Sequence, residues 1–331
     1  ASLAAVTALA LTGCSGSGRT GGDASESAAA GFAADASIGI ALPDKTSENW
    51  VLAGDLFKDG LEEAGFKADV QYAPASNTVA EQQNQISSMI TNGAKVIVIG
   101  AKDGKQLGTQ LQQAADAGVK IIAYDRLIEN TPNVDYYVAF DNYKVGELQG
   151  QALLDGLAAR SGHAAPWNIE LFSGSPDDAN SAVFFNGAMS VLQPKIDDGT
   201  LVVKSGQTTI EQAATLRWQQ STAQERMENL LTANYQGDTK VNGVLSAYDG
   251  LSRGIITALQ NNGYTGTIDD GFPIVTGQDA EIASVKLIQD GVQHSTIFKD
   301  TRLLAERAVT VAVDLLNGKE PEANNTTDYD N

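Results

Sequence analysis

The sequence predicts an α/β protein built from two doubly wound parallel-sheet lobes joined by a hinge. From Ser37 onward, short apolar strands alternate with amphipathic helical segments, which is the pattern of repeated strand–helix units. The strands are apolar throughout, as in KVIVI at 95–99, so helices should cover both faces of each sheet. The pattern begins again after Asn142, and 331 residues are more than a single core usually holds.

The first series of strands alternates with helices that end at glycines. We expect strands at 38–42, 68–72, 95–99 and 119–124. We expect helices at 50–65, 78–92 and 105–117. Gly65, Gly93 and Gly118 end these helices, because glycine readily adopts the left-handed backbone found at helix C-termini.

The second series repeats this alternation over a similar length. We expect strands at 167–172, 201–204, 241–246, 273–276 and 295–298. We expect helices at 143–158, 180–193, 221–234, 250–262, 280–290 and 301–317. Ligands of such sheets bind outside the carboxyl ends of the strands, so two facing lobes should form a cleft that a hinge closes.

The composition excludes several classes of function. The formal net charge is −19, from 41 acidic and 22 basic residues, which opposes nucleic-acid binding and leaves no basic patch for anionic lipid. One cysteine and two histidines allow no internal disulfide and form no cluster with metal-ligand spacing. We therefore expect neither a metal nor another cofactor.

The amino terminus is typical of an exported, lipid-anchored protein. Residues 1–13 form an apolar stretch too short to span a membrane, and we interpret it as the remnant of a signal peptide. The run LTGC at 11–14 resembles the lipobox of bacterial lipoproteins, in which the cysteine carries lipid; an ordinary signal peptide with a chance cysteine is the alternative. Residues 14–36 are small, polar and glycine-rich, so lipidated Cys14 and this flexible tether should hold the body at the outer face of the cytoplasmic membrane.

Polar and aromatic residues recur just after the predicted strand ends. The candidate site residues are Lys45, Asn49, Trp50, Asp103, Asp125, Arg126, Asp178, Asn180, Trp218, Asp249, Asp279 and Lys299. Carboxylates, arginine and lysine make strong hydrogen bonds with hydroxyl groups, and a tryptophan ring can lie against the C–H face of a pyranose. Together these residue types favour a sugar site in the predicted cleft.

Each candidate also has a purely structural interpretation. Asp103 and Asp249 both precede a glycine and a helix, so each suits helix capping as well as ligand binding. Arg126 could form a surface ion pair with Asp125, and the tryptophans could belong to the core. The recurrence of such groups at one topological position is what favours a binding site.

Eight motifs carry a resemblance to a known family. They are PDKTSENW (43–50), AYDRL (123–127), AFDNYKVGELQ (139–149), NIELFSGSPDDAN (168–180), LRWQQSTAQ (216–224), SAYDGLS (246–252), TGQDAE (276–281) and STIFKDTR (295–302). At these motifs the chain resembles the periplasmic sugar-binding proteins of ABC importers, of the ribose- and xylose-binding type. It is most similar to the branch that binds multiple monosaccharides, and the resemblance covers nearly all of residues 37–330.

The resemblance implies a role for the polar candidates on both lobes. Asp125 and Arg126 resemble the pair that holds sugar hydroxyls from the first lobe. Asp178 and Asn180 resemble polar ligands of the second lobe. The family pattern therefore implies hydrogen bonds to one sugar from both sides of the cleft.

The remaining candidates are implied to enclose the sugar. Trp50 and Trp218 resemble the two aromatic rings that sandwich it. Asp279 resembles a further carboxylate of the second lobe, and Lys299 resembles a basic ligand near a crossing strand.

The resemblance also implies where the chain crosses between the lobes. Phe140, Asp141 and Asn142 resemble the first hinge crossing, and 297–300 resembles the second. The implied N-terminal lobe is 37–141 plus 299–331, and the implied C-terminal lobe is 142–298. Relatives continue into further strands and a third crossing, so we interpret the sequence as truncated at Asn331.

Two departures from the family pattern bear on specificity. Relatives often carry arginine where this chain has Asn49, so the resemblance gives no support for acidic sugars such as uronates. Tyr248 stands where ribose and xylose binders usually have asparagine, which changes one hydrogen bond to the sugar.

The function implied is capture of a monosaccharide and delivery to the permease and ATPase subunits of an ABC importer. Neutral aldoses such as glucose, galactose, arabinose or xylose suit the site, and we expect a monomer without catalytic residues.

An enzyme with paired carboxylates is the alternative, but adjacent Asp177 and Asp178 lie on one element, unlike a usual catalytic pair. The effector domain of a LacI-type transcription factor shares the fold, but it follows a helix-turn-helix, whereas this chain has a lipobox-like segment there and an acidic net charge. This class is therefore excluded. A further role with a chemoreceptor or sensor stays open.

Overall fold

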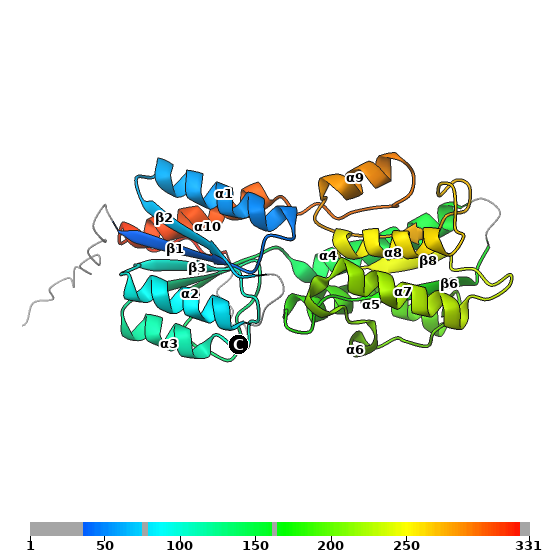
Figure 1. Ribbon diagram of the computed structural model, residues 1–331, viewed down its shortest axis with the longest axis horizontal. Coiled ribbons are helices and arrows are strands. Elements are labelled where there is room, and N and C mark those ends of the chain that lie inside the picture. Colours follow the sequence, from blue (N-terminus) through cyan, green and yellow to red (C-terminus); the bar gives the residue numbers. More distant parts are fainter. Residues whose placement is uncertain (1–35, 75–78, 161–163, 325–331) are drawn as a thin grey trace, which may run out of the picture.

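The computed structural model describes residues 36–74, 79–160 and 164–324 (Figure 1). The expected signal peptide remnant, the lipidation site Cys14 and nearly all of the expected tether lie outside these residues. So does the end of the chain after residue 324. The described residues form two α/β lobes, each with one parallel sheet between two layers of helices, which confirms the predicted fold class.

The first lobe contains a five-stranded parallel sheet in the order β2-β1-β3-β4-β5. The strands are β1 (Ser37–Leu42), β2 (Lys67–Tyr72), β3 (Val96–Ile99), β4 (Lys120–Tyr124) and β5 (Tyr136–Val138). In the centre of the sheet, Ile40 of β1 is in register with Val70 on one side and Val98 on the other. Parallel order brings the carboxyl ends of all five strands to one edge, which faces the second lobe.

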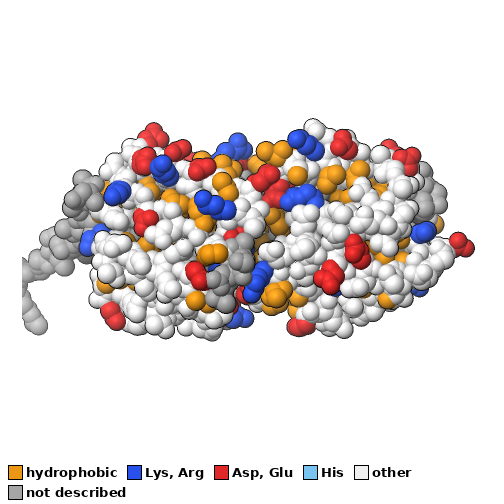
Figure 2. Space-filling model, in the orientation of Figure 1, with side chains coloured by type: hydrophobic (Ala, Val, Ile, Leu, Met, Phe, Trp, Pro, Cys, Tyr) orange, Lys and Arg blue, Asp and Glu red, His pale blue; other side chains and the backbone are white. Residues whose placement is uncertain are grey.

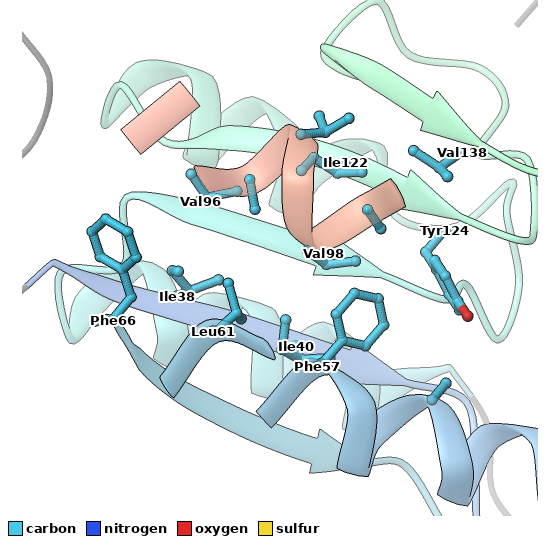
Figure 3. Close-up of a cluster of buried hydrophobic side chains, with 14 of the residues drawn as sticks. Ile38, Ile40, Phe57, Leu61, Phe66, Val96, Val98, Ile122, Tyr124 and Val138 are labelled. Carbon is cyan, nitrogen blue, oxygen red and sulfur yellow. The ribbon is translucent and has the colours of Figure 1, made fainter. Parts of the chain in front are cut away.

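Four helices cover this sheet: α1 (Glu48–Glu63), α2 (Ala80–Thr91), α3 (Gly108–Asp116) and α10 (Thr301–Leu316). Figure 1 shows α1 and α10 on one face and α2 and α3 on the other. Figure 3 shows why α1 docks: Phe57 and Leu61, one helical turn apart, point onto Ile38 and Ile40 of the sheet. Burial of these side chains fixes the position of α1, whose first turn borders the cleft.

The second lobe contains a four-stranded parallel sheet in the order β7-β6-β8-β9. Its strands are β6 (Trp167–Phe172), β7 (Leu201–Val203), β8 (Gly243–Ser246) and β9 (Ile274–Val275). Its helices are α4 (Asn142–Ala159), α5 (Asn180–Asp197), α6 (Ile210–Ala213), η1 (Leu216–Trp218), α7 (Gln220–Asn234), α8 (Asp249–Asn261) and α9 (Ile282–Gln289). Two separate apolar clusters, one on each face of the sheet, form the core of this lobe.

Two segments join the lobes among the described residues. The chain leaves the first lobe after β5 and enters α4, where the Asp141 carboxylate accepts a hydrogen bond from the Lys144 amide at 3.0 Å. It returns to the first lobe just before α10, which packs against α1. Asp141 therefore caps the first helix of the second lobe, next to Asn142, at the crossing itself.

Some predicted elements differ from the observed ones. The strand expected at 295–298 is wrong in extent, because only Ile297 pairs there, through an isolated bridge to Gln278. The side chain of Thr296 turns back to bond Asp249 instead of lying in a ladder. The sequence analysis also missed the short elements β5, α6 and η1, which have too few residues to show a period.

Candidate ligand-binding site

A cavity of about 210 Å³ lies between the lobes, at the carboxyl ends of the strands of both sheets. Figure 2 shows the two lobes meeting at a waist, with acidic and basic side chains gathered near the junction. Nine of the predicted site residues line this cavity: Asn49, Trp50, Asp125, Arg126, Asp178, Asn180, Trp218, Asp279 and Lys299. The strands and helices of both lobes thus bring together residues up to 250 positions apart in sequence (49 to 299).

Arg126 and Asp178 form an ion pair across the cleft. The Arg126 Nε lies 3.0 Å from Asp178 Oδ2, and the side chain of Asp178 is only 4% exposed. Burial raises the pKa of Asp178, while the Arg126 guanidinium opposes this effect. Arg126 also donates to the carbonyl of Ala101 at 3.1 Å, which fixes the guanidinium at the cavity wall.

Asp178 also orients Trp218 of the second lobe. Its carboxylate accepts a hydrogen bond from the Trp218 indole Nε1 at 3.1 Å and another from the Asn180 amide at 3.0 Å. The Asn180 side chain in turn donates to the Asp125 carbonyl of the first lobe at 2.9 Å. One buried carboxylate therefore holds an arginine, an indole and the start of α5 in fixed positions.

Two tryptophan rings border the cavity from opposite lobes. Trp50, on the first turn of α1, lies edge-on to Tyr124 with ring centroids 6.1 Å apart. Trp218 lies edge-on to Phe184 at 6.4 Å and to Tyr248 at 6.0 Å. Each ring is thus fixed by another aromatic ring of its own lobe and keeps a surface toward the cavity.

Lys299 occupies the second crossing, between two carboxylates. Its Nζ lies 3.1 Å from Asp279 Oδ1 and 3.8 Å from Asp125 Oδ2, and its side chain is 9% exposed. Burial alone would lower the pKa of Lys299, but the two carboxylates outweigh it and hold the pKa above its ordinary value. Lys299 is therefore a fixed cation that bridges the lobes at the cavity.

The whole folded body matches one protein family. Residues 38–320 match the periplasmic binding protein domain. The chain belongs to this family of periplasmic binding proteins. It is 53% identical over 301 residues to the multiple sugar-binding periplasmic receptor ChvE of Rhizobium radiobacter, covering 91% of this chain and 84% of that protein. It is 37% identical over 297 residues to the D-xylose-binding periplasmic protein of Escherichia coli, covering 90% and 83% of the two chains.

Solved structures of this family share the fold. A solute-binding protein of an ABC transporter from Clostridium phytofermentans, with bound β-D-glucose, has a TM-score of 0.82 at 43% identity and covers 89% of each chain. A carbohydrate transporter solute-binding protein from Chloroflexus aurantiacus, in complex with D-glucose, has a TM-score of 0.77 at 36% identity. It covers 88% of this chain and 86% of that one.

These relatives confirm the resemblance seen in the sequence. The chain is a periplasmic-type solute-binding protein and not an enzyme, because its close relatives are binding proteins and receptors. The family also implies a location outside the cytoplasm. In the described residues, no helix is long and apolar enough to cross a membrane, and no group of three or more His, Cys, Asp or Glu is placed to hold a metal ion.

Three predicted site residues of this binding protein lie outside the cavity lining. Lys45 is exposed and its ammonium lies 4.6 Å from the centre of the Tyr72 ring. Asp103 accepts hydrogen bonds from the Lys105 amide and the Gln106 side chain, so it stabilises a turn. It does not cap a helix, because α3 begins only at Gly108.

Asp249 is the third residue, and it lies one layer behind the cavity. Its buried carboxylate accepts from the Glu281 amide at 2.9 Å, the Gln293 side chain at 3.0 Å and the Thr296 hydroxyl at 3.0 Å. Burial raises the pKa of Asp249 to about 7, although these hydrogen bonds oppose the shift. Asp249 thus fixes the loop that carries Asp279 into the cavity.

Several lining residues escaped the sequence analysis. They include Asp44, Phe140, Phe184, Arg217, Gln219, Gln220, Tyr248, Arg253 and Gln278. Phe184 lies one helical turn after Asn180, and Arg253 lies one turn after Asp249, so helical spacing could have indicated both. Tyr248, which departs from the family pattern, lies two residues after the end of β8.

Proposed function

We propose that this protein captures a neutral monosaccharide in the cavity between its lobes and delivers it to an ABC importer. The observation that carries the proposal is the pair of tryptophan rings, one from each lobe, bordering a small cavity with charged hydrogen-bonding groups. The relatives named for sugars and the glucose-bound structures support the same ligand class.

The chemistry of the cavity suits sugar hydroxyls. Asp125 and Asp279 accept hydrogen bonds from hydroxyls, while Arg126 and Lys299 donate to their oxygens. The C–H faces of a pyranose lie against the rings of Trp50 and Trp218, so apolar burial and hydrogen bonding act on different faces of one ligand. Contact with the sugar stays a prediction for all nine of the predicted residues that line the cavity.

The pairing of charges favours a neutral ligand over an acidic one. Arg126 pairs with Asp178, Lys299 with Asp279, and Arg253 donates to Glu281 at 2.6 Å. A uronate would place a further carboxylate near Asp125 and Asp279, which would repel it. The three cations are already paired with carboxylates of the protein, so they would offset this repulsion only weakly. Glucose, galactose, arabinose and xylose are therefore the proposed cargo.

The proposal extends to the anchor and the partners. Cys14 at the end of an apolar run supports lipidation and attachment to the outer face of the cytoplasmic membrane. A single two-lobed cleft needs no second subunit, so we propose a monomer. Its proposed partners are the permease and ATPase subunits of the importer and a chemoreceptor or sensor. Loss of fatty-acid labelling in Cys14→Ser, with labelling of the wild type, tests the anchor.

Isothermal titration calorimetry tests the sugar assignment. The chain is titrated with D-glucose, D-galactose, L-arabinose, D-xylose, L-fucose and D-glucuronate. We expect saturable 1:1 binding of at least one neutral aldose with micromolar or tighter affinity, and weaker binding of the uronate. The absence of binding by every aldose would contradict the proposal.

Sugar binding should also depend on Trp218 at the cavity, and it should not respond to the loss of a tryptophan away from the cavity. Trp218→Phe should weaken binding, because phenylalanine lacks the indole N–H that Asp178 holds. Trp167→Phe is the matched control, because Trp167 begins β6 at the opposite end of the strand from the cavity. Equal affinities of the two variants would argue against a role for the Trp218 ring.

A further inference from the structure

Beside the cleft, two glutamates on opposite lobes each accept a hydrogen bond from a backbone amide of the other lobe. The Glu48 carboxylate of the first lobe accepts from the Ile282 amide of the second lobe at 3.0 Å. The Glu281 carboxylate of the second lobe accepts from the Glu48 amide of the first lobe at 3.3 Å. We call these two reciprocal bonds the interlobe exchange; neither glutamate lines the cavity.

Each carboxylate of the interlobe exchange meets the start of a helix on the other lobe. Glu48 is the first residue of α1, and Ile282 is the first residue of α9. Glu281, the cap residue of α9, makes no side-chain hydrogen bond to its own helix. The first amides of a helix need acceptors and favour negative charge, so α9 receives its acceptor from the first lobe.

Glu281 is held in place by residues that form the cavity wall. Its carboxylate accepts from the Tyr248 hydroxyl at 2.7 Å and from Arg253 at 2.6 Å, and both of these residues line the cavity. The Glu281 side chain is 1% exposed, so it keeps this orientation. The cavity wall and the interlobe exchange are therefore parts of one hydrogen-bonded group.

The two hydrogen bonds of the interlobe exchange can form only when the lobes are closed. Glu48 and Glu281 are like charges at the same junction, and their repulsion is offset by Arg253 and by the two helix starts. Opening the cleft separates both amide–carboxylate pairs at once. The Ile282 amide at the start of α9 then has only water as its acceptor. Hydrogen bonds with a charged acceptor are stronger than neutral ones, so this loss biases the equilibrium toward closure.

We propose that the interlobe exchange controls how long the ligand stays bound, by stabilising the closed cleft without touching the ligand. The inference rests on the proposed function, since it concerns the release of the captured sugar. A ligand leaves a hinged cleft only after opening, so loss of the exchange raises the dissociation rate and changes the association rate little.

Stopped-flow tryptophan fluorescence measures the rates, because Trp50 and Trp218 both face the cavity. Glu48→Ala should release D-glucose, or whichever aldose binds, about tenfold faster, as expected for the loss of one interlobe hydrogen bond to a charged acceptor. The backbone amide of residue 48 still donates to Glu281 in this variant. Glu48→Gln keeps an acceptor oxygen and should give an intermediate rate. Glu48 is exposed, so its variants should fold, whereas Glu281 is buried and paired and makes a poor test.

Glu63→Ala is the matched control, because Glu63 is an exposed acidic residue at the far end of the same helix. The unfolding temperature without sugar should be the same for Glu48→Ala and Glu63→Ala. Equal dissociation rates for these two variants overturn the inference. If the wild type binds no aldose, the proposed function fails instead. Small-angle X-ray scattering without sugar then decides: a larger radius of gyration for Glu48→Ala than for Glu63→Ala supports the exchange, and equal radii overturn it.

Discussion

The two aromatic walls of the cavity are built in different ways. Trp50 belongs to the regular helix α1, and its ring packs against Tyr124, which is part of the first lobe's core. Trp218 lies in the short segment η1, where both Arg217 and Trp218 have left-handed backbones, with φ of 56° and 55°. The first wall thus follows from the fold, whereas the second depends on local contacts that hold an unfavourable backbone.

Polar contacts hold the second wall. The Ser175 hydroxyl accepts from the Arg217 amide at 2.7 Å, and Asp178 accepts from the Trp218 indole. Gly174 lies directly against the ring, so that a Cβ added there would overlap it. The difference between the walls predicts that substitutions around Trp218 disturb binding. Asp178→Ala and Gly174→Ala test this, and two further variants test residues away from the ring.

The largest effect is expected from Asp178→Ala. Removing this carboxylate leaves Arg126 buried without its ion-pair partner and frees the Trp218 indole. Breaking a buried pair costs about 3–5 kcal/mol, so sugar affinity measured by calorimetry should fall by at least a hundredfold. Asp177→Ala, which removes the neighbouring carboxylate, is the control and should bind nearly as tightly as the wild type. A similar loss in both variants would contradict this account of the second wall.

The next effect concerns Asp249, which fixes the loop of Asp279, and it depends on pH. The pKa of Asp249 is raised from 3.8 to about 7 in the folded protein, because burial disfavours its charge. A raised pKa means that its contribution to stability is complete below pH 3.8 and is lost as the pH rises through about 7. The free energy of unfolding falls by at most about 1.4 kcal/mol per pH unit in this range, and relaxation around Asp249 reduces this slope.

Asp249→Asn removes this titration. Urea unfolding between pH 4 and pH 8 should show the wild type losing stability relative to Asp249→Asn as the pH rises. A difference that stays constant across this range would show that Asp249 does not titrate as described. Because Asp249 fixes the loop of Asp279, the variant should also bind sugar more weakly at every pH.

Gly174→Ala should have a smaller effect. Its new methyl group overlaps the Trp218 ring and the hydroxyl of buried Ser181, so both side chains must move, while no charge changes. We expect roughly a tenfold loss of affinity, equivalent to about 1.4 kcal/mol. Gly108→Ala is the control, because a Cβ there meets only the Asn130 carbonyl at 3.8 Å. Unchanged affinity in Gly174→Ala would mean that the ring position is not critical.

The contrast between the walls also explains what the sequence could predict. Strand ends meet at one edge of a parallel sheet, so residues just after them, such as Asp125 and Asp279, were placed in the cavity correctly. The same rule misplaced Asp103, because a loop can turn its side chain back to its own backbone. The rule locates positions along the chain but does not give the direction of a side chain.

Contacts between the lobes were beyond sequence reasoning. Glu48 meets Ile282 across 234 positions, through a backbone amide that any residue type would supply. No residue pattern marks such a contact, because its geometry depends on the angle between two rigid lobes. The left-handed backbone of Trp218 was hidden for a similar reason, since neither Arg217 nor Trp218 is a residue type that favours it.

The smallest effect is expected from Lys45→Met, which tests the border of the first wall. Lys45 follows β1 as the strand-end rule requires, yet its ammonium lies over the ring of Tyr72, which ends the edge strand β2. Methionine keeps the length of the side chain, so affinity for the sugar should stay within about twofold of the wild type. Lys299→Met removes a buried cation from Asp279 and Asp125 and should lose far more. A large loss of sugar affinity in Lys45→Met would mean that the first wall also depends on an exposed polar side chain. The two walls would then differ less than their backbones indicate.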